Sequence, residues 1–397
     1  PDGNAFLSFG INHIHPGWWN QPYNRTAWKN ILGVSELQGP EFDKSLRNWF
    51  IESRHLFGLN TLGVHNDLNL LNQPAFMPYV QPIEFVDIAH WKTDVPDENF
   101  VDVFSDTFKV HCRKLAEEMA APLAEDPFLI GYAMTDCPLF TEEDCRERTN
   151  VIGGRRRGNR IGWPRRLRNL NQDAPGKQRY VELMKKLYRN DINDFNGIYD
   201  TKLDSFEELA RSINWRPNID LSNGFEIRDN VEFLKLIVRA YYQTTSDAIH
   251  RVDPNHLFWG DKLNGNTDSI DTVLPVISEF VDVIFYQMYA KFGIQEKGLE
   301  RWSKISERPF VNGDSSFSVQ TEMTPRPFGP IATDQMQKAE WAGEFFRKAF
   351  SRSDFIGWHY CGLIDTWVDG GSGSYFTKTD EFGTMAGRQH TGLLMAD

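Results

Sequence analysis

One stretch, FLIGYAMTDCP at residues 128–138, limits what this chain can fold into more than any other. Its first half is wholly apolar, as expected of a strand buried on both faces. Asp136 closes the apolar run, and Pro138 then ends the strand and starts a loop. A predicted helix at residues 100–123 precedes it. An acid at the C-terminal end of a parallel strand is the position at which a (β/α)8 barrel carries its chemistry.

A second stretch, RPFVNGDSSF at residues 308–317, has the same design and carries Asp314. Either Asp alone is equally well explained as a strand-end hydrogen-bonding group. Together they fall on the predicted fourth and seventh strands, so we expect them to face each other across the mouth of one barrel. Glycosidases cut with two carboxylic acids that flank the bond, one protonated and one ionised. The pair therefore predicts a glycosidase site.

Eight predicted strands alternate with helices along the chain. The strands are expected at residues 5–14, 57–66, 76–86, 128–138, 256–263, 281–289, 309–317 and 355–366, and the helices at 40–56, 100–123, 178–193, 206–213, 229–252 and 334–350, with residues 20–38 as loop. This order predicts an α/β fold, a (β/α)8 TIM barrel, rather than an open sheet. We expect one catalytic domain over residues 1–397. It would carry an insertion with extra helices at 141–228 and a glycine-rich loop at 370–386 that is long enough to cover the mouth.

Charge and motifs exclude several functions. The formal net charge of −12 argues against nucleic acid and anionic membranes as partners. The four cysteines, Cys112, Cys137, Cys145 and Cys361, show no metal-binding spacing and no disulfide framework. No apolar run reaches the roughly 18 residues of a membrane span. Without a GxGxxG motif or a P-loop, no nucleotide is indicated, and we expect no cofactor.

Polar and aromatic side chains follow the predicted strand ends, where a substrate would lie. The aromatic share of 13% is high, and each ring belongs either to the core or to a sugar-stacking surface. The predicted substrate-binding residues are His13, His15, Trp18, Asn66, Trp259, Asp261, Lys262, Gln287, Tyr289, Trp358, Tyr360 and Asp365. Glu84 is a further carboxylate of this kind. His13 and His15 are equally well explained as a hydrogen-bonded loop pair. No metal is expected, because no third ligand lies near them in sequence.

The segment GGRRRGNRIGWPRRLRN at residues 153–169 carries seven arginines in an acidic protein. One interpretation is a solvated loop whose arginines pair with nearby acids. The other is recognition of an anionic group such as sulfate or uronate, because arginine binds oxyanions through two parallel hydrogen bonds.

Several segments resemble the agarase-related barrels around glycoside hydrolase family 50. They are DPFLIGYAMTDCP, GDKLNGN, VIFYQMY, RPFVNGDSSF, GWHYCGLIDTW and, near the end, HTGLL. The resemblance covers most of the chain and implies a glycoside hydrolase acting on a galactan-type, red-algal polysaccharide or its oligosaccharides. The substrate would be sulfated if the arginine-rich segment faces the mouth.

The chain departs from that family at both catalytic positions. The family's β-agarases carry an Asn-Glu pair on strand four and a glutamate on strand seven, whereas this chain has Thr135-Asp136 and Asp314. Each aspartate is one methylene shorter, which would widen the gap between the acids on an unchanged backbone. That change would fit a deeper-seated sugar, an inverting mechanism, a different linkage or a loss of hydrolysis.

The sequence therefore predicts a glycoside hydrolase with Asp136 as general acid/base and Asp314 as nucleophile or base. The alternative is a non-catalytic carbohydrate-binding barrel descended from such an enzyme. The chain begins at Pro1-Asp2 without Met or a signal peptide, as a trimmed sequence would. We expect a secreted or periplasmic protein.

Overall fold

The structure is a computed structural model. It describes residues 5–21, 24–89, 95–140, 162–216, 220, 222–267, 269–321, 327, 329–365 and 392–394. The predicted glycine-rich loop at 370–386 and the first part of the arginine-rich segment lie outside the described residues.

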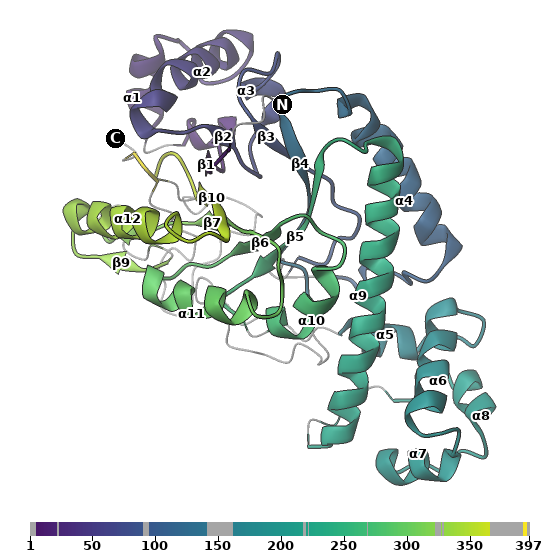
Figure 1. Ribbon diagram of the computed structural model, residues 1–397. Helices are drawn as coiled ribbons and strands as arrows, with labels where there is room; N and C mark the ends of the chain where they lie inside the picture. The colour runs from purple at the N-terminus through teal and green to yellow at the C-terminus, as the bar shows by residue number, and fades with distance from the viewer. Residues whose placement is uncertain are drawn as a thin grey trace.

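Eight parallel strands close into a barrel in the order β1-β10-β7-β6-β5-β4-β3-β2 (Figure 1). The strands are β1 Ser8–Ile11, β2 Thr61–Leu62, β3 Tyr79–Pro82, β4 Leu129–Asp136, β5 Leu257–Asn264, β6 Ile284–Gln287, β7 Phe310–Ser315 and β10 Phe355–Tyr360. A short parallel pair, β8 Ser318–Val319 and β9 Ile331–Ala332, stands apart. The predicted (β/α)8 barrel is confirmed, with each observed strand inside or within one residue of its predicted range.

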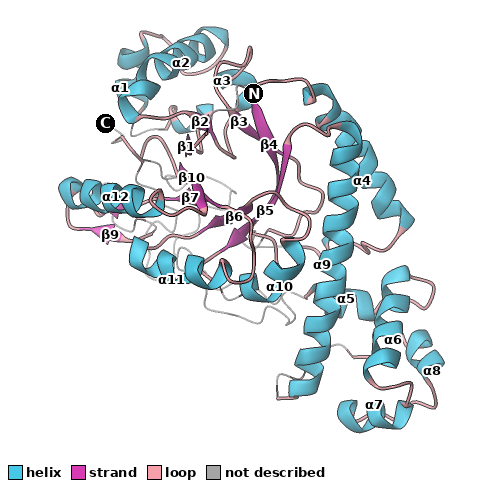
Figure 2. Ribbon diagram, in the orientation of Figure 1, coloured by secondary structure: helices cyan, strands magenta, loops and turns pink. Residues whose placement is uncertain are grey.

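The helices are α1 Arg25–Leu32, α2 Pro40–Ser53, α3 Leu68–Leu71, α4 Asp106–Met119, α5 Trp163–Arg168, α6 Pro175–Leu187, α7 Ile192–Tyr199, α8 Phe206–Arg211, α9 Gly224–Val252, α10 Ser269–Ile277, α11 Phe292–Trp302 and α12 Gln335–Ala349. Most of the helices surround the barrel, while α6, α7 and α8 lie beside the far end of α9 (Figure 2). Among the residues described, none of these helices combines the length and apolar character needed to cross a membrane.

Two helix predictions need correction. Residues 20–38 are not all loop, because α1 lies within them and ends at Gly33, whose φ of +65° suits glycine. Helix α4 begins at Asp106 rather than at residue 100. The side chain of Ser105 accepts a hydrogen bond from the Phe108 amide and so caps the helix there.

The apolar residues form two cores. A small one fills the barrel, where Trp259 and Phe285 pack edge to face, with ring centroids 5.2 Å apart, among Ala133 and four valines. A much larger one lies between the barrel and the helices. Strand residues alternate between these cores, as the two-residue period requires.

Helix α9 is 29 residues long and extends past the barrel to α5–α8, which gather around its far end (Figure 1). Arg168 on α5 is fully buried there, 2.9 Å from Glu226 of α9. Tyr188 and Tyr199 both donate hydrogen bonds to Asp229 of α9. Of the arginine-rich segment, Arg168 is thus committed to an internal ion pair, and anion binding stays a prediction for the rest.

The Phe285 ring lies so close to the backbone of strand β7 that position 313, directly before Asp314, requires a glycine. A Cβ at this position would lie 1.8 Å from the Phe285 ring. Alanine at position 313 would therefore force the Phe285 ring or strand β7 to move.

We expect Gly313→Ala to lower the free energy of unfolding by about 1–3 kcal/mol, because overpacking strains a filled core. The matched control is Gly197→Ala in α7, where nothing lies within 4 Å of the added Cβ. That change should leave stability equal or raise it by up to about 1 kcal/mol. Urea denaturation of both variants tests this, and equal effects would contradict the packing argument.

Candidate active site at the mouth of the barrel

A bulge in β5 aims Lys262 into the mouth. Gly260 has a φ of +68°, and the pairing with β4 shifts between Ala133 and Asp136. The bulge reverses the alternation: Trp259 lies inside the barrel, Asp261 faces Tyr241 of α9, and Lys262 turns inward. Bulges next to active sites commonly re-aim side chains in this way.

The Lys262 ammonium lies between the two aspartates predicted to be catalytic. Its Nζ is 2.7 Å from Asp314 Oδ2 and 3.1 Å from Asp136 Oδ1. The contact with Asp314 is a hydrogen bond, whereas the contact with Asp136 is an ion pair without hydrogen-bond alignment. The two distances together place these carboxylate oxygens no more than about 5.8 Å apart. The structure thus brings Asp136 and Asp314 to one site.

All three groups are charged at neutral pH. Burial alone would raise the pKa of Asp136 and of Asp314. The Lys262 ammonium and the contacts with His65 and His13 together outweigh it, so both pKa values lie well below the usual range. Burial alone would lower the pKa of Lys262, but the two carboxylates raise it above its ordinary value. The net charge of these three groups is −1.

Two histidines complete the cluster. His65 Nε2 lies 3.2 Å from Asp136 Oδ2 and 3.1 Å from Lys262 Nζ, and His13 Nε2 lies 3.6 Å from Asp314 Oδ2. The two imidazoles stack with centroids 4.8 Å apart and planes 18° apart. Burial lowers the pKa of His13 despite its contact with Asp314.

Both histidines, and Cys137 after Asp136, have left-handed backbones. The φ angles are +58° at His13, +64° at His65 and +52° at Cys137. Such conformations cost a non-glycine residue about 1 kcal/mol or more and cluster at functional sites. Here they follow three strands of the barrel at its mouth.

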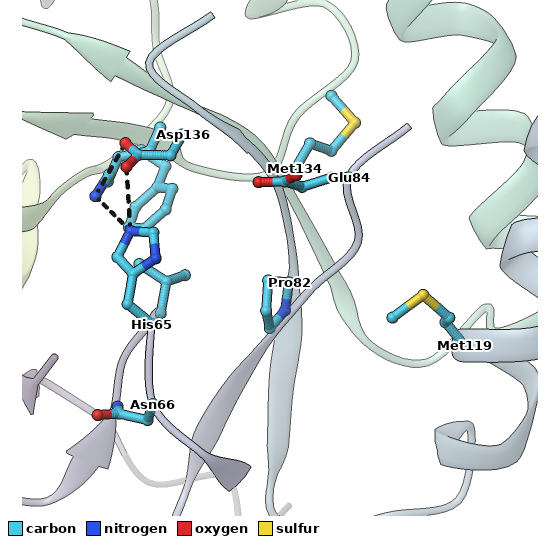
Figure 3. Close-up of a pocket in the computed structure, with 10 residues that line it drawn as sticks. His65, Asn66, Pro82, Glu84, Met119, Met134 and Asp136 are labelled. Atoms are coloured by element: carbon cyan, nitrogen blue, oxygen red, sulfur yellow. Dashed lines mark hydrogen bonds and ion pairs between the residues drawn. The ribbon is translucent and has the colours of Figure 1, made fainter. Parts of the chain in front are cut away.

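A pocket of about 370 Å³ opens beside Asp136 (Figure 3). Its lining consists of Val64, His65, Asn66, Pro82, Glu84, Met119, Met134, Asp136, Lys262 and Phe285. Figure 3 shows the carboxylate of Glu84 directed toward the side of the pocket where Asp136 lies. The volume is in the range of small-ligand sites, and the lining combines apolar walls with convergent charged groups.

Four predicted substrate-binding residues lie at or beside the cluster. His13 and Lys262 belong to it directly. Tyr289 hydrogen-bonds the Cys361 thiol, which in turn contacts Asp314. Gln287 follows Phe285 by two residues on β6, so it shares the inward face.

Four others are buried, and the structure does not bring them to the candidate site. Trp259 is 2% exposed inside the barrel. Trp358 and Tyr360 face the helices, where Trp358 packs 4.4 Å from Phe345 of α12 and the Tyr360 hydroxyl donates to the Phe317 carbonyl. Asp261 lies behind β5, and burial raises its pKa to about 7. Strand alternation turns Trp358 and Tyr360 toward the helices, and the bulge turns Asp261 outward. Trp259 faces inward but is packed in the core of the barrel.

The remaining four serve local structure. His15 is exposed and accepts a hydrogen bond from the Gly17 amide. Asn66 ties β1 to β2 through the Ile14 amide and the Ile11 carbonyl, although it also lines the pocket. Trp18 packs partly buried against the large core. Asp365 accepts a hydrogen bond from the Gly392 amide and so holds the late segment.

The predicted substrate-binding set omitted His65 and Asn12, although both lie near the ends of predicted strands. Asn12 donates to Asp314 Oδ1 at 3.0 Å and to the Gly313 carbonyl at 2.7 Å, which fixes the orientation of the acid. Beneath the cluster, His359 is fully buried, and burial lowers its pKa to about 3. Its Nε2 bonds Ser8 at 2.8 Å. Position at a strand end was the available signal for His65 and Asn12, whereas none marked His359.

Replacing Lys262 by Met should reverse the pH dependence of stability. In the parent chain the depressed carboxyl pKa values stabilise the fold above the unfolded pKa near 4, and this contribution is lost on acidification. Without the ammonium, two buried carboxylates repel, so the folded state takes up a proton more readily than the unfolded state. Lys262→Met should lose roughly 3–5 kcal/mol at pH 7 and recover part of it at pH 5.

Urea unfolding at pH 5 and pH 7 measures this effect. The exposed Lys114→Met on α4 is the control, whose pH dependence should match the parent chain. A Lys262→Met variant that loses stability on acidification as the parent does would contradict the charge argument.

Similarity to known proteins agrees with this architecture. The chain is 26% identical to β-agarase B of Vibrio sp. (strain JT0107) over 195 residues, which is 49% of this chain and 20% of that protein. It is 21% identical to β-agarase A of the same organism over 350 residues, 82% of this chain and 32% of that protein. The chain thus spans a fifth to a third of the length of these relatives. No protein-family model matches it.

Solved agarases share its fold. The structure superposes on an agarase, AgWH50C, with a TM-score of 0.73 at 16% identity, covering all of this chain and 60% of that one. An exo-β-agarase superposes with a TM-score of 0.68 at 16% identity, over 91% of this chain and 45% of that one. The chain is therefore an agarase-like barrel, related to the β-agarases in sequence and to family 50 glycoside hydrolases in fold.

Proposed function

We propose that this chain is a glycoside hydrolase that cleaves a galactan-type polysaccharide or its oligosaccharides, with Asp136 as general acid/base and Asp314 as nucleophile. The observation that carries the proposal is the pair of carboxylates on β4 and β7. Asp136 Oδ1 and Asp314 Oδ2 lie within about 5.8 Å of each other, and Asp136 lines the pocket. Two carboxyl groups at this separation, on different strand ends of a barrel, suit glycosidic bond cleavage.

Lys262 gives the two acids different roles. It holds Asp314 by the shorter, aligned contact, which keeps that carboxylate ionised and ready to attack the anomeric carbon. A general acid must carry a proton, so the proposal requires a bound sugar to break the longer contact between Lys262 and Asp136. Burial then raises the pKa of Asp136 and favours its protonated form. Asp136 would donate that proton to the leaving-group oxygen and later take one from water.

The substrate class rests on the relatives. Their names describe them as agarases, so an agar-type galactan is the first substrate to test. Sulfation of that substrate and a secreted or periplasmic location remain parts of the proposal. Glu84, exposed on the pocket wall, is placed to hydrogen-bond sugar hydroxyls.

Replacing either acid by its amide tests the catalytic assignment. On a panel of agar, carrageenan and their oligosaccharides, Asp136→Asn and Asp314→Asn should each lower reducing-end release by about 10²-fold or more, because each removes an essential acid or nucleophile. Asp247→Asn, exposed on α9, is the matched control and should retain parent activity. Activity near that of the parent in both site variants would remove the proposal.

The stereochemical outcome is a separate test. Retaining glycosidases hold their carboxyl groups about 5–5.5 Å apart, and inverting ones about 6.5–9.5 Å. Asp136 Oδ1 and Asp314 Oδ2 lie within about 5.8 Å of each other, which is below the inverting range. We therefore expect the first-formed product to keep the anomeric configuration of the substrate. Proton NMR of early product on any active substrate decides this, and an inverted anomer would show that a water separates the acids during reaction.

One observation favours a second function, a saccharide-binding barrel without hydrolysis. Lys262 occupies the space between the acids, and both carboxyl pKa values are low. If no sugar displaces the ammonium from Asp136, no general acid forms. Saturable oligosaccharide binding by calorimetry, with no product from any panel member, would support this function, and detectable product would exclude it.

A further inference from the structure

The mouth of the barrel contains a cage of cation ligands that the proposed hydrolysis does not require. Ring nitrogens of His13 and His65 and a carboxylate oxygen of Asp314 all lie within 4.8 Å of one another. Asp136 adds a second carboxylate, 3.2 Å from His65 Nε2. The sequence predicted no metal, because no third ligand lies near His13 and His15 in sequence and His13, His15, His65 and Asp314 would all have to converge.

The spacing of these atoms is close to that of a metal's ligand shell. A tetrahedral Zn²⁺ with bonds of about 2.0–2.2 Å sets its ligand atoms roughly 3.3–3.6 Å apart. His65 and Asp136 are 3.2 Å apart, and His13 and Asp314 are 3.6 Å apart. Two pairs therefore already have the required spacing, and small side-chain rotations would bring the pairs together.

A cation already lies in the cage. Lys262 Nζ is 2.7 Å from Asp314 Oδ2, 3.1 Å from Asp136 Oδ1 and 3.1 Å from His65 Nε2. The ammonium thus contacts three of the four ligand groups, as a bound ion would. With two carboxylates against one ammonium, the cage keeps a net charge of −1, which a divalent cation in place of the ammonium would neutralise.

Supporting contacts hold the ligands in place. Asn12 donates to Asp314 Oδ1 at 3.0 Å, which leaves Oδ2 directed at the cage. The left-handed backbones of His13 and His65 aim both rings at the same point. Hydrogen bonds of this kind to a metal-binding carboxylate orient it and raise metal affinity.

We propose that His13, His65 and Asp314 bind a divalent transition metal such as Zn²⁺, which takes the place of the Lys262 ammonium. Asp136 supplies the fourth ligand. Two imidazoles and two carboxylates suit Zn²⁺, whereas Ca²⁺ and Mg²⁺ prefer sets made only of oxygen ligands. A metal bound here would occupy both acids, so it would inhibit the proposed hydrolysis, and a chelator would reverse the inhibition.

Calorimetric titration of the metal-free chain with Zn²⁺ tests the proposal without reference to activity. The parent chain should bind one Zn²⁺, and Lys262→Ala should bind it at least about tenfold more tightly, since no ammonium competes. Asn12→Ala should weaken binding by about 10–100-fold. Ca²⁺ and Mg²⁺ should give no comparable heat.

Histidine variants locate the ion. His13→Ala and His65→Ala should each abolish the one-to-one binding, whereas His111→Ala, exposed on α4, should leave it unchanged. If Lys262→Ala does not fold, Zn²⁺ binding by the parent chain and its histidine variants tests the proposal. Absence of Zn²⁺ binding by the parent chain, or binding that survives loss of both His13 and His65, would overturn the proposal.

Discussion

The ammonium of Lys262, held between Asp136 and Asp314, is the interaction on which the rest of the mouth depends. Two largely buried carboxylates this close together repel, and one of them would take up a proton at neutral pH without a counter-charge. The lysine keeps both ionised and fixes the distance between them. It also contacts His65, so four strand ends meet around one cation.

The backbone pays a conformational cost to build this arrangement. Gly260 takes a left-handed conformation so that β5 can turn Lys262 inward and Asp261 outward. His13, His65 and Cys137 take similar conformations without the freedom of glycine. The closed barrel and the large core outside it supply the stability that tolerates such strain.

The side chains of Asp136 and Asp314 leave a space between their carboxylates that the Lys262 ammonium fills. A site of this kind has two requirements for hydrolysis: a sugar must enter, and the ammonium must release Asp136. The proposed metal binding uses the same cage, because its ligands already surround a positive charge.

The sequence by itself determined the barrel and the two strand-end acids. Apolar runs that end in polar residues alternate with amphipathic helices, and this pattern is compatible with few other folds. Asp136 and Asp314 were predicted to be catalytic from their positions at strand ends. Which other side chains reach the mouth was decided by the tertiary structure. Trp259, Trp358 and Tyr360 lie near strand ends in sequence but point into one core or the other.

The physical reason is that register and bulges decide to which side of the sheet a strand residue points. A local sequence pattern specifies neither of them. Asp261 and Lys262 were both predicted to bind substrate, but one shift at Gly260 turns Asp261 away from the mouth and Lys262 into it. Likewise, His13, His65 and Asp314 meet only because the barrel closes, bringing β1 between β10 and β2. Local sequence determined the strands and helices and the polar residues at the strand ends. Closure of the barrel and strand register decided which of these side chains meet at the mouth.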